Sequence, residues 1–284
     1  MTDKIIALVD GSIYSQSVCE HAAWVAERTG WAVELLHILG RREGAEKADY
    51  SGSIALGART ALLEELAELD AQRARLITHR GRAILEDARA ILDRTGIDEI
   101  TTRLRHGDIV DTVAEQEAGA EMILIGKRGE AADFARGHLG SNLERILRAS
   151  RKPVFVAARE FKPINRALIA YDGGASAMRA VEHVARMPIY QGLEVSVVTV
   201  GNASDAARKG LADAKAALRA AGITAETRII AGQPETALAK LVEEAPFDMV
   251  VMGAYGHSRI RSLIIGSTTT EMIRSCKVPI VLTR

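Results

Sequence analysis

Short apolar runs alternate along the chain with longer segments in which apolar residues recur at helical spacing. Val18, Ala22 and Val25, for example, are spaced to share one face of a helix. The short runs are rich in isoleucine and valine and often apolar at consecutive positions, which is typical of strands buried on both faces. We therefore predict an α/β fold, a parallel sheet with helices on both faces and right-handed crossovers. The predicted strands are Ile5–Val9, Val33–Ile38, Ile100–Leu104, Met122–Ile125, Val154–Val156, Ala167–Ala170, Val195–Val200, Thr227–Ile230, Met249–Met252 and Ile280–Leu282.

The same landmarks occur twice in the same order, which indicates an internal duplication. An apolar run that leads into Asp-Gly opens each half. An apolar run followed by a glycine-rich loop comes later, and each half closes with an apolar run behind a proline. The matched segments are 4–12, 121–129 and 152–157 in the first half and 166–174, 248–256 and 278–283 in the second. The pattern lapses around Pro163, so we predict two domains, 1–160 and 161–284.

The first half carries an extra stretch, near 41–80, that has no counterpart in the second half. Part of it reads A-L-L-E-E-L-A-E-L-D-A-Q-R-A-R-L, which is rich in charge and helical in pattern. Two interpretations stay open for this insertion. It is either a longer solvated helix or a lid or partner surface.

Composition and charge exclude several classes of function. The chain is 48% hydrophobic and 26% charged, as in ordinary globular proteins, and 37 basic residues balance 37 acidic ones. A net charge of zero gives no long-range attraction to nucleic acid or to an anionic membrane. No apolar run reaches the roughly 18 residues of a membrane span, and the first run is a strand, not a signal peptide. We therefore expect a cytoplasmic protein without nucleic-acid or membrane partners.

The side chains that could carry chemistry do not form a catalytic or metal-binding set. Cys19 and Cys276 lie far apart and outside any Cys/His cluster, so we expect both to be reduced core residues. Asp10 and Asp172 each lack a second acid or a matched base at short spacing. We therefore interpret these two aspartates as ligand acceptors or turn residues, and we assign no catalytic residue and no metal site.

A glycine-rich loop in the second half has the features of a phosphate-binding site. Gly253 follows a predicted strand, and two residues separate it from Gly256. After nine further residues, Gly266-Ser267 opens a helix that begins at Thr268. Glycine removes the Cβ atoms that would keep the backbone away from a phosphate. Free N–H groups at the start of the helix stabilise anions, and two hydroxyls add donors there. Three basic residues lie within the loop: His257, Arg259 and Arg261.

These glycines could instead serve only as turns, with Ser267 as an N-cap. Two observations favour the phosphate site over that interpretation. The loop follows a central strand, where open parallel sheets bind ligands, and it carries basic side chains.

The spacing of Gly253, Gly256 and Gly266-Ser267 resembles the ATP-binding signature G-2x-G-9x-G-S/T of the universal stress protein family. Asp172 matches the aspartate that this family places near adenine and ribose. The resemblance covers the chain twice, so the sequence is similar to a tandem universal stress protein. It implies two repeats of a five-stranded parallel sheet with helices on both faces, and ATP together with Mg²⁺ as the ligand.

Carried over position by position, the resemblance implies a nucleotide site in the second half. The residues so implied are Ala170, Asp172 and Val200 around the adenine and ribose, Met252 and Gly253 against the ribose and phosphate, and Gly256, Gly266, Ser267 and Thr268 around the phosphates.

The first half departs from the family pattern. Ten residues, not nine, separate Gly129 from Gly140, and Glu130 and Asp133 in this loop would repel a triphosphate. Basic residues offset these acids in part, namely Lys127, Arg128, Arg136 and His138. We predict a weaker second nucleotide site made of Asp10, Ile38, Gly126, Gly129, Gly140, Ser141 and Asn142.

We predict an ATP-binding stress-response or regulatory protein that acts on an unknown protein partner through its nucleotide-dependent conformation. Catalysis would be limited to slow ATP hydrolysis, because no residue is a suitable base for water. Two alternatives stay open. One is a scaffold or a module that holds an apolar ligand at the degraded first site. The other is an ATP-using transferase, which would need acid or base residues of its own.

The final strand of each half is short and apolar, and an exposed strand edge of this kind needs cover. We expect Val154–Val156 and Ile280–Leu282 to bring the halves together as a pseudo-twofold pair within one chain. The sequence leaves open whether the full chain also forms a homodimer.

Overall fold

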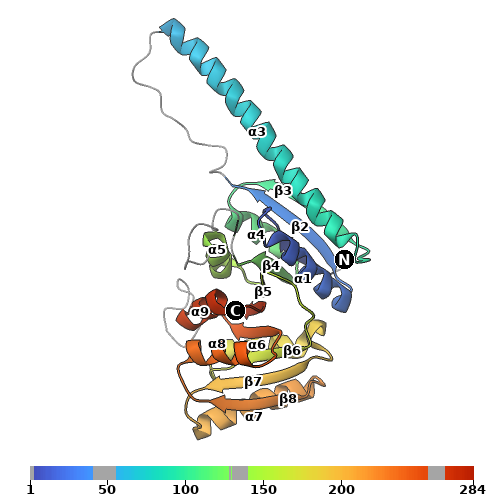
Figure 1. Ribbon diagram of the computed structural model, residues 1–284, viewed down its shortest axis with the longest axis vertical. Coiled ribbons are helices and arrows are strands. Elements are labelled where there is room, and N and C mark those ends of the chain that lie inside the picture. Colours follow the sequence, from blue (N-terminus) through green and yellow to red (C-terminus); the bar gives the residue numbers. More distant parts are fainter. Residues whose placement is uncertain (1–2, 41–55, 128, 130–139, 255–265) are drawn as a thin grey trace.

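The computed structural model describes residues 3–40, 56–127, 129, 140–254 and 266–284, with side chains in the helix at 56–92 described from Leu62 onward (Figure 1). The first half contains β1 (Lys4–Leu8), α1 (Ser15–Thr29), β2 (Ala32–Leu39), α3 (Leu56–Leu92), β3 (Ile100–His106), α4 (Ile109–Glu117), β4 (Met122–Gly126), α5 (Ser141–Ala149) and β5 (Val154–Ala157). The second half contains β6 (Arg166–Ala170), α6 (Ala175–Arg186), the short 3₁₀ helix η2 (Pro188–Tyr190), β7 (Glu194–Val200), α7 (Asp205–Ala220), β8 (Ala225–Ile230), α8 (Pro234–Glu244), β9 (Met249–Gly253), α9 (Ser267–Ser275) and β10 (Ile280–Thr283).

All strands join one ten-stranded sheet in the order β3-β2-β1-β4-β5-β10-β9-β6-β7-β8. Within each half the strands are parallel, and the two halves have the same internal order. The predicted α/β architecture of two parallel five-stranded repeats is therefore confirmed. The two repeats do not form separate sheets, because β5 and β10 pair with each other.

Each strand contributes side chains to both faces of the sheet, because successive side chains point in opposite directions. Along β1, Ile5 and Ala7 belong to one buried cluster, whereas Ile6 and Leu8 belong to the other. The first cluster lies under α1, α6, α7 and the end of α3, and the second lies under α4, α5, α8 and α9. This double burial accounts for the consecutive apolar residues in the strands.

The junction between the halves is an antiparallel pair of buried strands. Ile280 lies opposite Val156, Val281 opposite Phe155 and Leu282 opposite Val154, and all of these side chains are at most 3% exposed. The expectation that the two final strands cover each other is therefore confirmed.

Polar contacts to backbone carbonyls reinforce this junction. The Lys127 ammonium donates to the Cys276 carbonyl, and the Arg28 guanidinium donates to the Ile189 carbonyl at 2.9 Å. Arg284 Nη1 reaches back to the carbonyl of Arg148 at 3.1 Å. Each of these cations crosses from one half to the other, so the junction extends well beyond the strand pair.

Two buried histidines occupy equivalent places in α1 and α6. His21 is fully buried between Phe155 and Phe161, and its Nδ1 lies 2.6 Å from the Ser17 carbonyl oxygen. His183 is 4% exposed and packs edge-on against Tyr190, with a centroid distance of 5.5 Å. Burial lowers the pKa of His21 to about 4 and that of His183 to about 3. Both imidazoles are therefore neutral in the native fold at neutral pH.

Acid should destabilise the fold before the carboxylates titrate. An unfolded histidine has a pKa of about 6.5, so below this pH the unfolded chain binds protons that the folded chain excludes. The stability from each neutral histidine is complete above pH 6.5 and declines as the pH falls toward the folded value. We expect a loss of about 2 kcal/mol per histidine between pH 6.5 and 5. Urea unfolding at a series of pH values measures it. His183→Phe should remove about half of the loss, whereas His106→Phe, at an exposed position, should remove none. If the free energy of unfolding of His183→Phe declines with falling pH as steeply as that of the unchanged chain, the assignment is wrong.

The halves should also depend on each other for solubility. Residues 1–160 and 161–284 expressed separately leave the apolar edges of β5 and β10 unpaired, so each half should self-associate in light scattering. Co-expression should restore a soluble one-to-one complex. Two monomeric, well-behaved halves would show that the junction is dispensable.

Candidate functional site

Each half has a topological switch point at its first strand. β1 lies between β4 and β2, and β6 lies between β9 and β7, so the connections that follow neighbouring strands depart in opposite directions. In open parallel sheets this arrangement leaves a crevice at the carboxyl ends of the central strands, where ligands bind. The sequence places Asp172 and Gly253 at this point in the second half, and Asp10 and Gly126 in the first.

In the second half Asp172 shapes the turn between β6 and α6. Its Oδ1 accepts a hydrogen bond of 2.8 Å from the Gly174 backbone N–H, and Gly173 between them has a φ of +81°. Asp172 is exposed, whereas Ala170 at the end of β6 is buried. Val200 ends the neighbouring β7 and is half-buried. The structure therefore places the acidic side chain beside two apolar positions at one end of adjacent strands.

Gly253 has a packing reason to lack a side chain. A Cβ atom at this position would lie 2.8 Å from the backbone carbonyl carbon of Ser176 in α6 and 2.4 Å from its hydroxyl oxygen. The close approach of α6 to the end of β9 thus requires glycine here. Met252, the preceding residue, is 5% exposed and belongs to the core under α8 and α9.

The start of α9 gathers donors at the same end of the sheet. Gly266 is the N-cap and makes no side-chain cap, so the first backbone N–H groups of the helix have no intrahelical acceptor. Thr269 Oγ1 lies 3.4 Å from the carbonyl oxygens of Gly253 and Ala254, which ties the helix to the end of β9. The first turn of α9 is therefore held near the end of β9.

An acid that sequence reasoning missed engages the two hydroxyls expected to hold phosphates. Glu235 lies in the first turn of α8, and its Oε1 accepts hydrogen bonds from Thr268 Oγ1 at 2.9 Å and Ser267 Oγ at 3.2 Å. A hydrogen bond from its own backbone N–H, followed by that from Thr268, holds the pKa of Glu235 below its usual range. A carboxylate thus occupies the junction between the N-termini of α8 and α9, both of which favour negative charge.

The loop segment 255–265, which includes Gly256, His257, Arg259 and Arg261, lies outside the described residues. The loop sequence between Gly253 and Gly266 contains no acid, whereas Glu235 reaches the start of α9 from a distant segment of the chain. The separation of 32 and 33 residues from its partners explains why no local motif reveals it. Its position just after Pro234, at the start of a helix, was the available signal.

In the first half Asp10 has the same position as Asp172 but is more enclosed. Its Oδ1 accepts from the Ser12 backbone N–H at 3.0 Å and from Ser15 Oγ at 3.3 Å. A Cβ at Gly129 would lie 2.8 Å from Asp10 Oδ2, so the glycine allows the loop to approach the carboxylate. Ile84 of α3 comes close to Gly11, where a Cβ would lie 2.9 Å from its Cδ1. The long helix therefore reduces the space beside the carboxyl end of β1.

The expectation that Lys127 offsets the acids of the first loop is wrong. Its side chain is buried and its ammonium donates to the Cys276 carbonyl, in the other half of the chain. Burial lowers the pKa of Lys127 to about 8. The remaining loop residues invoked in that expectation, Arg128, Glu130, Asp133, Arg136 and His138, lie outside the described residues.

An ion pair takes the place of the Glu235 contact in the first half. Arg145 of α5 binds Asp108 Oδ2 at 2.5 Å, and Asp108 caps α4 by accepting from the Val110 backbone N–H. The hydrogen bond from Arg145 is the main cause of the lowered pKa of Asp108. Gly140 is the N-cap of α5, and the next two residues, Ser141 and Asn142, are exposed. Ile38 is half-buried near the end of β2 and Gly126 ends β4.

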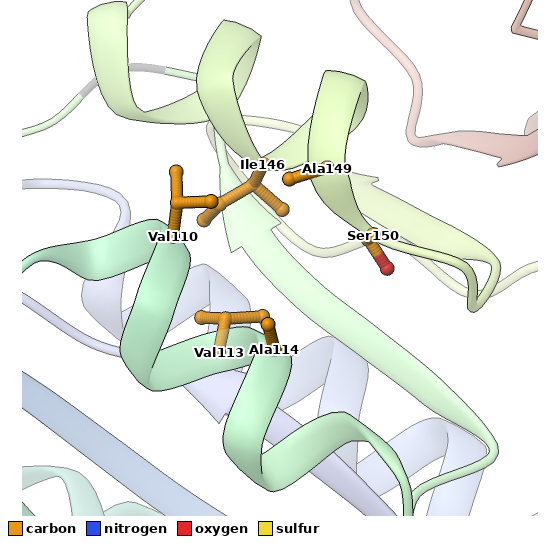
Figure 2. A pocket seen from close by; sticks show the side chains of 6 residues that line it. All are labelled: Val110, Val113, Ala114, Ile146, Ala149 and Ser150. Atoms are coloured by element: carbon orange, nitrogen blue, oxygen red, sulfur yellow. The ribbon is translucent and has the colours of Figure 1, made fainter.

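A small apolar hollow lies between α4 and α5 (Figure 2). Its lining is Val110, Val113, Ala114, Ile146, Ala149 and Ser150. The Ser150 hydroxyl is already engaged, since it donates to Glu117 Oε2 at 2.6 Å. This hollow offers no charged group to a nucleotide.

Within the described ranges, no three His, Cys, Asp or Glu side chains gather as a metal site. The same part of the chain contains no helix long and apolar enough to cross a bilayer.

The chain matches the model of the universal stress protein family over residues 1–158 and 201–284. Universal stress protein Slr1230 from Synechocystis is 35% identical over 99% of both chains. Universal stress protein Rv1996 from Mycobacterium tuberculosis is 23% identical, over 99% of this chain and 94% of the relative. The crystal structure of a universal stress protein from Archaeoglobus fulgidus covers 100% of this chain and 99% of its own, with a TM-score of 0.75 and 21% identity.

Proposed function

The chain belongs to the universal stress protein family, and from this premise we propose that its second half binds ATP with Mg²⁺ and signals the bound state to a protein partner. One observation carries this proposal. Asp172 follows β6, Gly253 ends the adjacent β9, and Thr269 of α9 contacts the Gly253 carbonyl, all at the switch point where the loop has the family spacing.

We assign the described residues to three parts of the ligand, the ribose, the adenine and the phosphates. Asp172 is an exposed carboxylate that can accept hydrogen bonds from ribose hydroxyls. Ala170 and Val200 lie on the adenine and ribose side, and Met252 and Gly253 lie against the ribose and phosphate. The free N–H groups at the start of α9 and the hydroxyls of Ser267 and Thr268 suit the phosphates. Gly256 joins them in the proposal by its place in the loop.

Glu235 is the reason that the proposal includes Mg²⁺. A phosphate that takes over the hydroxyls of Ser267 and Thr268 meets a carboxylate within a few ångströms, and like charges repel. Mg²⁺ prefers carboxylate and phosphate oxygens together, so it relieves this repulsion when it accompanies the nucleotide. The site therefore suits a magnesium complex better than free ATP.

The same residue supports a binding protein over a dedicated enzyme. A general base for water works best when its pKa lies near the working pH. The hydrogen bonds to Glu235 lower its pKa instead, which makes it a weak base. We therefore propose slow ATP hydrolysis at most, and a role in a cytoplasmic stress response through conformation.

The first half is proposed as the weaker nucleotide site. Asp10, Gly126, Gly129 and Gly140 keep their places, but Ile84 narrows the space and the Lys127 charge points elsewhere. The alternatives predict different bound molecules. Mass spectrometry of the purified chain separates them, because a scaffold for apolar ligands would carry a lipid-like molecule, and an ATP-using transferase would turn over ATP with an acceptor.

Blocking the start of α9 should remove ATP binding. A branched side chain in Gly266→Val would project toward the phosphates, whereas the equivalent Gly140→Val should change binding little. In the unchanged chain, Mg-ATP at about 100 times its Kd stabilises the fold by roughly 2.7 kcal/mol, measurable as a thermal shift on nucleotide-free protein. Gly266→Val should abolish most of this shift. If Gly140→Val abolishes it and Gly266→Val does not, the working site is in the first half.

Removing the charge of Glu235 should uncouple binding from Mg²⁺. Two unit charges about 4 Å apart in a watery site interact by about 1 kcal/mol, which corresponds to a factor of about five in affinity. Calorimetric titration of Glu235→Gln in EDTA should therefore show free ATP binding several-fold tighter than in the unchanged chain, with a smaller gain from Mg²⁺. Glu243→Gln, on the same helix and paired with Lys277, is the matched control. Equal affinities for free ATP in the Glu235→Gln variant and the unchanged chain would remove Glu235 from the site.

A further inference from the structure

The long helix α3 projects beyond the sheet and the other helices (Figure 1). Its last turns are anchored, since Leu85, Ala88 and Leu92 belong to the buried core. Every side chain from Leu62 to Arg80 is exposed or only half-buried. The equivalent helix of the second half, α7, has 16 residues against 37 in α3. Of the insertion predicted near 41–80, residues 56–80 belong to α3, and 41–55 lies outside the described residues.

The projecting part carries a row of leucines at the spacing of a helix seam. Leu62, Leu69 and Leu76 are seven residues apart, and Leu69 and Leu76 are 54% and 71% exposed. Ala83 and Ala90 continue the row toward the anchored end with small side chains. A seven-residue apolar repeat presents one face to a partner helix. A solvated helix alone does not account for three leucines on one line.

The charges of this segment are separated along the helix axis. Acidic residues gather in the first part, at Glu64, Glu65, Glu68 and Asp70. Basic residues gather in the second part, at Arg73, Arg75, Arg80 and Arg82. This order suits the dipole of one helix. It also makes the segment complementary to a reversed copy of itself.

We propose that α3 is a dimerisation arm, on which the leucine row of one chain packs antiparallel against the same row of a second copy. With Leu69 opposite Leu76 of the other copy, Leu62 lies opposite Ala83, and the acidic stretch 64–70 lies opposite segment 75–81, which carries two arginines and a histidine. A twofold axis then passes between residues 72 and 73, and the interface is the same surface on both chains. A parallel pair would instead place acids beside acids and bases beside bases.

The geometry of the fold leaves this surface available. The β5 and β10 edges are already paired inside the chain, so they cannot hold a second copy. The arm from Leu62 to Arg80 is about 28 Å long, at 1.5 Å per residue. Unpacked helical segments gain most of their stability from an apolar partner. The arm is independent of the proposed nucleotide site and needs no ligand.

Sedimentation equilibrium on the full chain tests the arm. The unchanged chain should be dimeric, and Leu69→Gln/Leu76→Gln should weaken dimerisation at least tenfold. Ala71→Gln/Thr78→Gln puts the same side chains, at the same spacing, on the other side of the helix and should leave the dimer intact. Circular dichroism checks that both variants keep their helices. A monomeric unchanged chain, or a dimer unaffected by the leucine changes, overturns the proposal.

Disulfide trapping tests the direction of the pair. The native cysteines, Cys19 and Cys276, are free and buried, so they do not compete with an introduced surface cysteine. Arg73→Cys lies beside the twofold axis and should form a covalent dimer on mild oxidation. Leu62→Cys should not, since the two copies of residue 62 are about 31 Å apart in an antiparallel pair. Efficient trapping through Leu62→Cys indicates a parallel pair and overturns the proposed arrangement.

Discussion

The antiparallel pairing of β5 with β10 is the constraint on which the rest of the molecule depends. It merges two parallel sheets into one, so the core on each face runs continuously through both halves. Phe155 and Val281 lie opposite each other at this junction and are fully buried, so each half shields an apolar side chain of the other from solvent. The duplication that the sequence records is therefore more than a repetition of a binding unit, since each copy supplies the cover that the other lacks.

The two switch points show how one architecture supports different local chemistry. In the second half, the N-termini of α8 and α9 share a carboxylate, Glu235, that holds two hydroxyls. In the first half, Asp108 and Arg145 neutralise each other across the equivalent pair of helices. An anion arriving at α9 meets donors that are already assembled but engaged by an acid. The equivalent helix pair in the first half has an internal counterion instead.

The strands, their order and the duplication could be predicted because they rest on local patterns: apolar runs buried on both faces, and landmarks repeated in order. The pairing of the final strands followed from their short apolar character. Lys127 and Glu235 could not be assigned correctly, because their partners come from segments more than thirty residues away. A sequence shows that a lysine adjoins a glycine loop, but burial and a distant carbonyl decide where its charge goes. The charge pattern of α3 was visible from the start, whereas its exposure depended on how far the sheet extends.

Helix α9 connects two features that seem unrelated in the sequence. Its first residues hold the hydroxyls engaged by Glu235, and its C-cap, Cys276, provides the carbonyl that receives the Lys127 ammonium. Nine residues of helix form a rod of about 13 Å between these points. The rod joins the two switch points, because its N-terminus lies at that of the second half and its C-cap contacts Lys127, the residue that follows β4 in the first half.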